Sequence, residues 1–417
     1  MVQRWILVGL AFLGSMSLWS QNTARVMFYN LLEFPEAPPS SRDLILKDII
    51  DEVEPDIFMV AELQDLNGAN IILDNALNDN INIYQSAPFV LNTSGSGGNI
   101  HQLLYYNTEK FSLELNDIIQ TSLRDINRYQ LKAKTSLSDT DPIIIEFFVA
   151  HFKASQGNSN EQIRFNMALD FTNYINANLS ADANVIFAGD FNFYSANESG
   201  FLQLFIGNTT IPMNDPVNQL GDWHTNSDFS NVHSQSTRES NNSFNDFGAG
   251  GGLDDRFDFM FVSGNLLDNT NNVSYINNSY QTLGNNSNCY NEDISDTSCG
   301  GFYNQNLRNL LWNMSDHLPL VMDLSFQQDF LSTADFSNNA SITLPSGNLV
   351  SEELEIYIPE KILYQVNELR IYNSFGQQVE NIRVKTSRVE LSTGQLSNGM
   401  YFIKANNGQI LKFVKSN

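Results

Sequence analysis

The chain of 417 residues has few cysteines and few basic residues. Its two cysteines, Cys289 and Cys299, have no histidine at metal-ligand spacing beside them, which argues against a catalytic thiol and a thiolate metal site. The 22 Lys and Arg residues face 47 Asp and Glu, giving a net charge of −25. Residues 1–345 hold 14 of the basic and 40 of the acidic groups. Such an acidic body disfavours tight, sequence-specific binding of nucleic acid through a basic surface.

The apolar stretch at the start of the chain is too short to predict a membrane span. It runs from Trp5 to Leu13, follows the single charge of Arg4, and precedes small and polar residues up to Ser20. This layout predicts a secretory signal peptide over residues 1–20 and no stable membrane insertion. A buried first helix or a retained anchor is the alternative.

The two cysteines lie ten residues apart in a stretch rich in Ser, Asn, Asp and Gly. In an exported chain this spacing favours a disulfide that closes a surface loop over two free thiols.

Apolar strands alternate with amphipathic helices through most of the chain. One helical face runs from Leu44 to Val53 before the strand Ile57–Ala61, and another from Ile163 to Ile175 before the strand Val185–Ala188. Further strands are predicted at Arg25–Asn30, Ile143–Ala150, Phe257–Val262 and Leu318–Leu324. The alternation predicts a layered α/β domain over residues 22–326.

The composition and residue pattern of the sequence change after Phe326. Residues 327–345 are polar and irregular, which predicts a linker. From Leu354 onward, short alternating segments are separated by turns such as Ser397-Asn398-Gly399. This pattern predicts a small all-β sandwich over residues 346–417.

Polar side chains recur where the apolar strands end. In chain order they are Asn30, Glu62, His151, Asp190, Asn192, Asp258, Asp316 and His317. Strand ends are the usual place for an active site in a layered α/β domain. Hydrolysis of a phosphate ester needs a cation on the phosphate and an oriented water, and carboxylate and amide oxygens suit Mg²⁺ or Mn²⁺. A bound cation would also let so acidic a chain attract a phosphate.

Each of these residues has a role that its chemistry allows. Asn30 and Glu62 are expected to bind the metal, Asp190 to accept a proton from the attacking water, and Asn192 to contact a phosphate oxygen. His317 is expected to stabilise charge on the phosphate with Asp258 fixing its tautomer, while His151 protonates the leaving oxygen. Singly, each residue has a structural alternative; the order along the chain carries the hypothesis.

Other motifs have no such context. His101, His224 and His233 are expected on the surface or in loops, and residues 94–98 and 248–252 are expected to be flexible glycine-rich turns.

The ordered motifs resemble those of the endonuclease/exonuclease/phosphatase superfamily, which includes deoxyribonuclease I and the neutral sphingomyelinases. They are Tyr29-Asn30, Ala61-Glu62, Ala150-His151-Phe152-Lys153, Gly189-Asp190-Phe191-Asn192, Arg256-Phe257-Asp258 and Ser315-Asp316-His317-Leu318-Pro319. The resemblance implies a four-layer αββα sandwich, Mg²⁺-dependent phosphoester hydrolysis, and a metal-side role for Asp316. It leaves open which histidine is acid and which is base, and Asp255 is an alternative to Asp258 as the partner of His317.

The segment around His233 and Arg238 is similar to that of exported bacterial members of this superfamily. Arg238 could bind a phosphate or pair with a surface carboxylate.

The tail resembles the C-terminal sorting domain of the Bacteroidetes type IX secretion system. Its motifs are Leu369–Gly376, Leu396–Lys404 and a basic end at Lys412 and Lys415, while Leu344-Pro345-Ser346-Gly347 replaces the usual Pro-Asn-Pro opening. The resemblance implies passage across the outer membrane, with the secretion machinery as a partner. A carbohydrate-binding or adhesion module is the alternative.

Together these features predict a monomeric, secreted or cell-surface phosphoesterase that uses Mg²⁺ or Mn²⁺. The expected substrate is a phosphodiester, such as DNA or RNA cut without strong sequence specificity. The alternatives are a phosphodiesterase like sphingomyelinase or phospholipase C, and a non-catalytic surface binding protein that keeps the fold.

Overall fold

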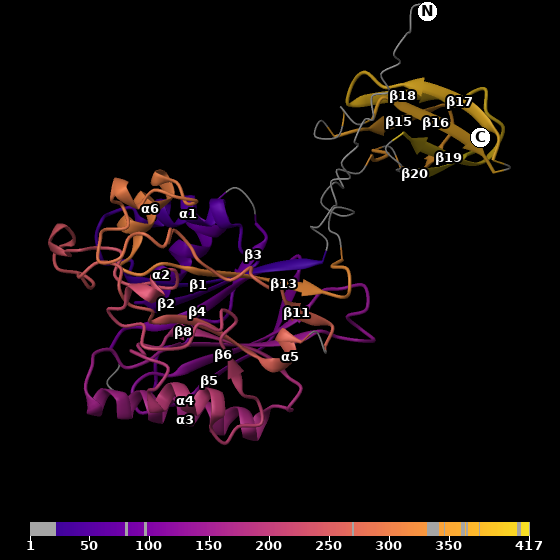
Figure 1. The fold of residues 1–417 in the computed structure, drawn as a ribbon. Coiled ribbons are helices and arrows are strands. Elements are labelled where there is room, and N and C mark those ends of the chain that lie inside the picture. The colour runs from indigo at the N-terminus through magenta and orange to yellow at the C-terminus, as the bar shows by residue number, and fades with distance from the viewer. Residues whose placement is uncertain are drawn as a thin grey trace, which may run out of the picture. The chain divides into compact units, whose positions relative to one another are not determined.

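The structure is a computed structural model that describes residues 22–79, 82–95, 98–268, 271–331, 342–345, 347–359, 363, 366–374, 376–406 and 410–416. The predicted signal peptide and much of the predicted linker lie outside these residues. The chain divides into two compact units, residues 1–331 and 332–417, and each is described separately (Figure 1).

The first unit contains two mixed sheets. The first sheet has the order β11-β13-β1-β2-β4-β3, with β12 also beside β13. Its strands are β1 (Thr23–Phe34), β2 (Ile57–Leu63), β3 (Tyr84–Ser86), β4 (His101–Asn107), β11 (Val273–Tyr275), β12 (Gln281–Thr282) and β13 (Leu320–Phe326). The second sheet has the order β5-β6-β7-β8-β10-β9. Its strands are β5 (Phe111–Ile119), β6 (Ile126–Ala133), β7 (Ile144–His151), β8 (Asn184–Asp190), β9 (Met213–Asn214) and β10 (Asp258–Ser263).

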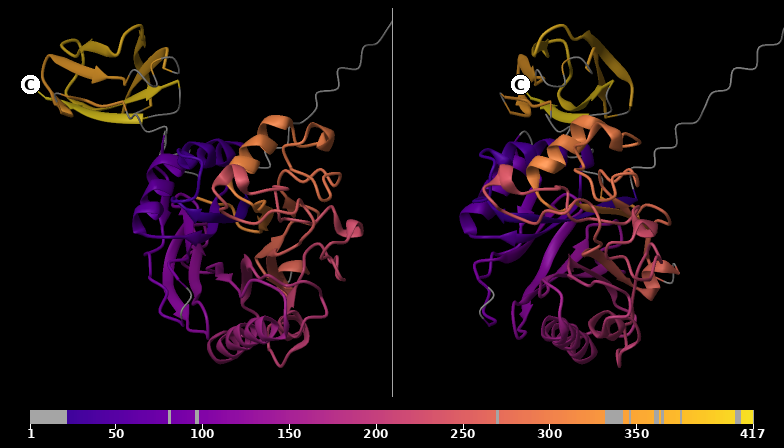
Figure 2. Two further views of the ribbon diagram at one scale, coloured as in Figure 1. Left: turned by 90° about the vertical axis from the view of Figure 1, so that its left-hand side faces the viewer. Right: turned by 60° about the vertical axis from the view of Figure 1, so that its left-hand side comes forward.

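Helices cover the outer face of each sheet. The first sheet is covered by α1 (Arg42–Val53), α2 (Leu66–Ile71), the π-helical segment η1 (Ile72–Leu77) and α6 (Gln305–Met314), and the second by α3 (Asn158–Asn178) and α4 (Ser199–Ile206) (Figures 1 and 2). The remaining helical segments are α5 (Gly264–Leu267), η2 (Ser227–Phe229), η3 (Asn242–Phe244) and η4 (Thr297–Cys299). The four layers confirm the predicted αββα sandwich.

The period-2 alternation of the central strands separates two hydrophobic cores. On β7, Phe147 and Val149 belong to the core shared by the two sheets, whereas Phe148 and Ala150 belong to the core under α3 and α4. β8 divides its side chains in the same way. Successive side chains of a strand point to opposite faces, so a strand buried on both faces must be apolar throughout. This is why β7 and β8 have continuous apolar sequences.

Helix α1 shows the complementary helical pattern. Its buried residues Leu46, Ile49, Ile50 and Val53 recur at intervals of three and four and form one face. The helix ends at Val53 because Glu54 takes a left-handed conformation, with φ of 51°, just before Pro55.

The second unit is a small β domain, as predicted. One sheet has the order β14-β20-β19-β16-β17, and β15 pairs with β18. The strands are β14 (Leu349–Val350), β15 (Glu353–Tyr357), β16 (Glu368–Asn373), β17 (Gln378–Arg383), β18 (Arg388–Ser392), β19 (Gly399–Ala405) and β20 (Ile410–Lys415). Leu354, Ile371 and Phe413 are among the residues of its own core.

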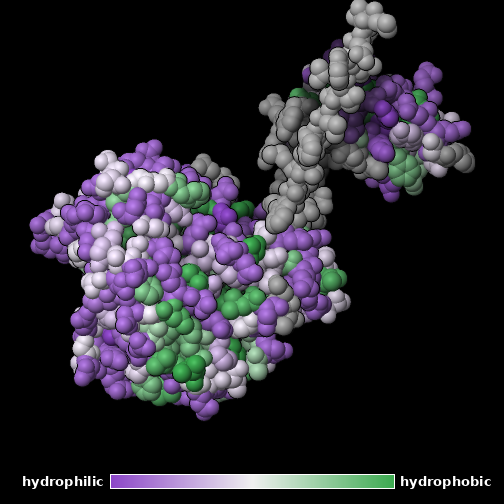
Figure 3. Space-filling view, viewed as in Figure 1, coloured by the Kyte–Doolittle hydropathy of each residue, from purple (hydrophilic) through white to green (hydrophobic). Residues whose placement is uncertain are grey.

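Polar residues cover most of the face of the first unit that Figure 3 shows, with a hydrophobic patch in its lower half. Among the described residues, no helix has the length and apolar character needed to span a membrane. Cys289 and Cys299 form the expected disulfide.

Candidate active site

The topology gathers the polar strand ends at one end of the two sheets. Asn30 lies in β1, beside Ala61 of the parallel strand β2, and Glu62 follows. In the second sheet, His151 at the end of β7 and Asp258 at the start of β10 both align with Asp190 at the end of β8. Parallel strands end at the same edge and antiparallel neighbours begin there, so the sheet register itself assembles the site.

Asp190 is the centre of this arrangement. Its Oδ1 accepts hydrogen bonds from the side-chain amide of Asn192, at 2.7 Å, and from the Asn192 backbone, at 3.2 Å. Its Oδ2 accepts from Nδ2 of Asn30 at 3.1 Å, and the same amide donates to Oε1 of Glu62 at 3.0 Å. Asn192 has a φ of 52°, a left-handed conformation that Asn tolerates better than most residues. The tight turn after β8 therefore brings both side chains to one point.

His317 is held by a buried carboxylate. Its Nδ1 lies 2.7 Å from Oδ2 of Asp258, which also accepts from Oγ of Ser234 at 2.6 Å. The Oγ of Ser315 accepts from the backbone of His317 and donates to the carbonyl of Asn30. The contact with Asp258 leaves Nε2 of the imidazole facing Asp190, 3.7 Å from its Oδ2. In the structure the partner of His317 is thus Asp258, whereas Asp255 contacts His224 at 2.5 Å.

His151 approaches the same carboxylate with different neighbours. Its Nε2 lies 3.5 Å from Oδ2 of Asp190 and 3.9 Å from Oε1 of Glu62. Arg124 donates to the backbone carbonyls of His151 and Phe152, both at 3.1 Å. The positive charge of Arg124 therefore lies close to His151.

The electrostatic environments of the two imidazoles are opposite. Burial lowers the pKa of His151 well below its ordinary value, and the positive charges of Arg124 and His317 act in the same direction. Burial also lowers the pKa of His317, but the carboxylates, led by Asp258, outweigh this effect and raise that pKa well above its ordinary value. The two shifts therefore favour His151 as the proton acceptor and His317 as the proton donor of the site.

At the carboxylates of the site, burial and mutual repulsion outweigh the positive charge of His317. Burial raises the pKa of Asp190, and the charges of Asp258 and Glu62 add to the rise. Burial likewise raises the pKa of Glu62, with Asp316 contributing. Like charges that share a buried site favour a bound cation, which removes their mutual repulsion.

Two overlapping groups of side chains have a metal-binding arrangement. The ligand atoms of Glu62, His151 and Asp190 lie within 4.8 Å of one another, and so do those of Asp190, Asp258 and His317. The expected metal ligand Asp316 is in neither group; its Oδ2 accepts from Nε2 of Gln235 at 3.1 Å. Within the described part of the chain, the buried Oδ1 atoms of Asp258 and Asp316 have no hydrogen-bond partner. Oxygen donors in these numbers fit a divalent cation.

Two residues of the site could not be singled out from the sequence. Nε2 of Gln235 lies 2.6 Å from Nε2 of His317, at the edge of the ring away from the Nδ1 that contacts Asp258. Arg124 lies on the loop between β5 and β6, where nothing in the sequence marks it. Both residues lie in irregular segments, so no periodicity signals where their side chains point.

The glycine-rich segment 248–252 is not the flexible surface turn that we expected. The backbone N–H of Ala249 donates to Oδ2 of Asp316 at 2.7 Å. Gly248 has a φ of 80°, and a Cβ there would lie 2.9 Å from Cγ of Asp316. A glycine is needed for this approach, and the segment positions Asp316.

Arg238 has neither of the roles considered for it. It is buried, its Nε donates to the carbonyl of Trp312 at 3.0 Å, and its guanidinium lies 3.4 Å from the ring centroid of Phe244. His101 is likewise buried, at the start of β4, where its Nδ1 accepts from the backbone of Asn92. His233 is also buried but lies in a loop, so the expectation of a surface or loop position is wrong only for His101.

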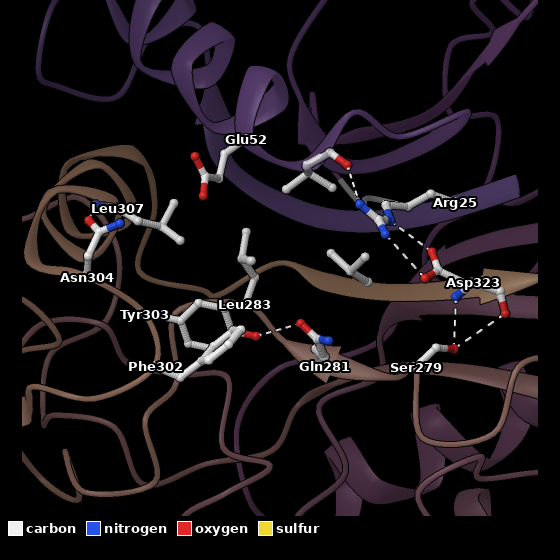
Figure 4. A pocket seen from close by; sticks show the side chains of 12 residues that line it. Arg25, Glu52, Ser279, Gln281, Leu283, Phe302, Tyr303, Asn304, Leu307 and Asp323 are labelled. Atoms are coloured by element: carbon white, nitrogen blue, oxygen red, sulfur yellow. Dashed lines mark hydrogen bonds and ion pairs between the residues drawn. The ribbon is translucent and has the colours of Figure 1, made fainter. Parts of the chain in front are cut away.

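A cavity of about 230 Å³ lies away from this site (Figure 4). Arg25 and Asp323 form an ion pair on its wall. Arg25 precedes Asn30 on β1, and Asp323 lies on β13, after His317. Phe302 and Tyr303 stand at another side of it. None of the predicted site residues lines this cavity.

Comparisons with known proteins give a match in the tail. Residues 348–416 match the family described as the secretion system C-terminal sorting domain. This match confirms the resemblance of the tail and the expected export to the cell surface or exterior. No curated protein sequence matches the chain.

Solved structures also align with about three quarters of the chain. The human Nocturnin catalytic domain with bound sulfate is 17% identical, covering 73% of this chain and 94% of that one, with a TM-score of 0.44. TDP2 from D. rerio, complexed with a single-strand DNA product, is 14% identical over 73% and 99% of the two chains, with a TM-score of 0.46. An endonuclease/exonuclease/phosphatase family protein from Bacteroides thetaiotaomicron is 15% identical over 73% and 98%, with a TM-score of 0.43. The assignment of the fold rests on the sheets and helices of the chain itself.

Proposed function

We propose that this chain is a secreted, divalent-metal-dependent phosphodiesterase that acts as an extracellular nuclease. The observation that carries the proposal is the convergence on Oδ2 of Asp190, where two imidazoles whose pKa values are shifted in opposite directions lie within 4 Å of the same carboxylate oxygen. Hydrolysis of a phosphodiester needs a proton acceptor for the incoming water and a proton donor for the leaving oxygen. A binding protein has no use for this pair.

Asp190 orients the attacking water in this proposal. Asn192 and Asn30 hold its two oxygens in one geometry before substrate binds. The amide of Asn192 is placed to donate to a phosphate oxygen when substrate replaces its contact with Asp190.

The two histidines divide the proton transfers. His151, neutral because of its burial and its cationic neighbours, accepts a proton together with Asp190. His317, kept cationic by its carboxylates, donates to the phosphate or to the leaving oxygen. This assignment reverses the expectation that His151 is the acid, and the reason is the charge around each ring.

Glu62 and Asp190 would hold the metal, with Asp316 on the same side. Asn30, which we expected to bind the metal, donates its Nδ2 to both carboxylates and would position them, while its Oδ1 accepts from the backbone of Leu32. A bound Mg²⁺ or Mn²⁺ would neutralise charge on the phosphate and lower the pKa of a coordinated water. The raised pKa values of Glu62 and Asp190 and the unbonded Oδ1 atoms support this requirement for a cation.

Export fits a substrate found outside the cell. The sorting domain at residues 348–416 supports the secretion machinery as a partner. A net charge of −25 argues against a basic nucleic-acid-binding surface, so we expect cleavage with little sequence preference. Phosphate esters of several kinds share the chemistry, and the assay must compare them.

The test is hydrolysis by the purified full-length chain, with Mg²⁺ or Mn²⁺, of bis-p-nitrophenyl phosphate, DNA, RNA and sphingomyelin in parallel. We expect the small diester and the nucleic acids to be cleaved, and EDTA to remove the activity. Restoration by added metal is the control for damage by the chelator. Full activity after removal of metal, or no hydrolysis of any substrate, would contradict the proposal.

A further inference from the structure

A second histidine–carboxylate pair lies beside the site and has no role in the chemistry described above. Nδ1 of His224 lies 2.5 Å from Oδ1 of Asp255, and Nε2 of the same ring lies 2.7 Å from the side-chain amide of Gln156. The arrangement repeats that of His317 and Asp258, with Nδ1 on a carboxylate and Nε2 directed away from it. The two carboxylates are three residues apart on one segment.

The pairs differ in exposure. The side chain of His224 is 32% exposed and that of His317 is 3% exposed. The contact of Nε2 on the outer side is with Gln156, which is itself exposed. A ligand in solution can therefore reach Nε2 of His224 by displacing an amide, without any movement of the core.

The backbone fixes the distance between the pairs. Gln235 forms a β-bridge with Asp255 on one side and with His317 on the other. Neighbouring bridged segments lie about 4.8 Å apart. The backbones of Asp255 and His317, one on each side of Gln235, are therefore roughly 10 Å apart. The N–H of Thr225 donates to the carbonyl of Asp254 at 3.0 Å, which holds the His224 loop to the same segment.

Aromatic packing fixes the orientation of His224. Its ring meets that of Tyr194 edge to face, with centroids 4.8 Å apart, and Tyr194 follows Asn192 by two residues. On its other side Tyr194 packs against Phe257, just before Asp258. Burial raises the pKa of Asp255 to about 6, and the adjacent His224 opposes the rise.

We propose that His224, oriented by Asp255, binds a flanking phosphate of a polynucleotide and thereby determines specificity for polymeric over small phosphodiesters. The inference rests on the proposed phosphodiesterase activity. Successive phosphates of a strand lie no closer than the rise of about 3.4 Å per nucleotide along a helix axis, so the backbone separation of roughly 10 Å between Asp255 and His317 corresponds to about three nucleotide steps at most. An imidazole backed by a carboxylate donates a charge-assisted hydrogen bond to such a phosphate.

The experiment compares two substrates that differ in the flanking group. The full-length chain and its His224→Ala variant are assayed with metal on bis-p-nitrophenyl phosphate, which has only the reacting phosphate, and on an oligothymidylate of eight nucleotides. We expect the ratio of KM for the oligonucleotide to KM for the small diester to rise about tenfold, the effect of one lost charge-assisted hydrogen bond. The ratio of kcat values should change little.

Three further variants complete the test. His224→Gln, which can still donate a hydrogen bond, should recover part of the KM ratio, and Asp255→Asn should raise it less than His224→Ala. Asp222→Asn is the matched control, because it removes the same charge two residues from His224, where Asp222 accepts from Asn197 instead. A thermal melt of each variant checks the fold.

The outcomes separate the two proposals. A wild-type chain that cleaves neither substrate would overturn the proposed function and this inference together. An active wild type whose His224→Ala variant changes both KM values equally, or neither, would overturn the inference alone.

Discussion

His151 and His317 stand at the same carboxylate oxygen, yet their surroundings have opposite charge. Arg124 is beside the first, whereas Asp258 and Asp316 surround the second. Both rings are buried, and burial alone would make both neutral. Burial lowers the pKa of both rings, and the Asp258 carboxylate that the register of β10 with β8 brings to His317 contributes most to reversing the direction for that ring.

The largest expected effect comes from removing the group that the two histidines share. Asp190→Ala should lower kcat on bis-p-nitrophenyl phosphate by about 10³-fold or more, because the water loses its orienting carboxylate and both imidazoles lose a common partner. The rate is measured from the p-nitrophenol released at fixed times. The melting temperature should not fall, since the lost carboxylate is buried among like charges.

Asp182→Asn, on an exposed turn that precedes β8 at the opposite end from Asp190, is the control for the change of charge. A wild-type rate in Asp190→Ala would show that the centre of the site lies elsewhere.

Replacing each histidine in turn tests whether the two rings have different protonation roles. His151→Gln and His317→Gln should each lower kcat by about 10²-fold to 10⁴-fold, the usual contribution of a general acid or base. Their pH profiles should differ. Activity that needs cationic His317 is lost as pH rises through its raised pKa, so His317→Gln should lack this alkaline fall while His151→Gln keeps it.

The measurement is kcat/KM as a function of pH for both variants with metal held constant. Identical profiles for the two variants would mean that the histidines are not distinguished by charge.

A smaller effect should follow from weakening only the surroundings of His317. Asp258→Asn keeps the size of the side chain but removes the charge that does most to raise the pKa of His317. The alkaline fall in kcat/KM should move to lower pH, and kcat should drop about tenfold to a hundredfold as the ring loses its orientation. Asp255→Asn is the matched variant, because Asp255 contacts His224 and should leave the alkaline fall in place. Equal displacement in both variants would contradict the assignment of Asp258.

The smallest effect concerns stability and a histidine outside the site. Burial lowers the pKa of His233 to about 4, below the value near 6.5 of an unfolded chain. The unfolded state therefore binds the proton more readily, and this group's contribution, about 3 kcal/mol at most, is lost as pH falls from 6.5 to 4.

Urea unfolding of the wild type and of His233→Gln at several pH values tests this expectation, with the exposed Asn231→Ala as control. The free energy of unfolding should fall less steeply with decreasing pH in His233→Gln. Parallel curves would show that the pKa of this imidazole is the same in the folded and the unfolded chain.

The strands that carry the site could be predicted because each is a buried apolar run. β2, predicted at Ile57–Ala61, extends to Leu63, and β8, predicted at Val185–Ala188, runs from Asn184 to Asp190. Apolar length and flanking breakers locate such strands well, and the polar residue at each end follows. The choice between Asp255 and Asp258 could not be made, because it depends on the residue at which β10 begins and therefore on which carboxylate aligns with Asp190.

The irregular stretch before β10 was the least predictable part of the site. Gln235, Gly248 and His224 are placed by long-range contacts with Asp316, His317 and Asp255. Such contacts leave no period in the sequence, and a glycine-rich segment has the same composition whether it is free or holds a carboxylate.

The disulfide connects the site to the redox state of the compartment. Inside the loop that Cys289 and Cys299 close, the N–H of Ile294 donates to the carbonyl of Thr237, and Thr237 donates in turn to the carbonyl of Asp316. Closing a loop of this size stabilises a fold by about 2–3 kcal/mol. Cytosolic thiols stay reduced, so the loop that supports Asp316 reaches its full rigidity only after the chain has left the cytoplasm. For the nuclease proposed above, export would thus complete the site as well as deliver it, and would spare the nucleic acids of the cell that makes it.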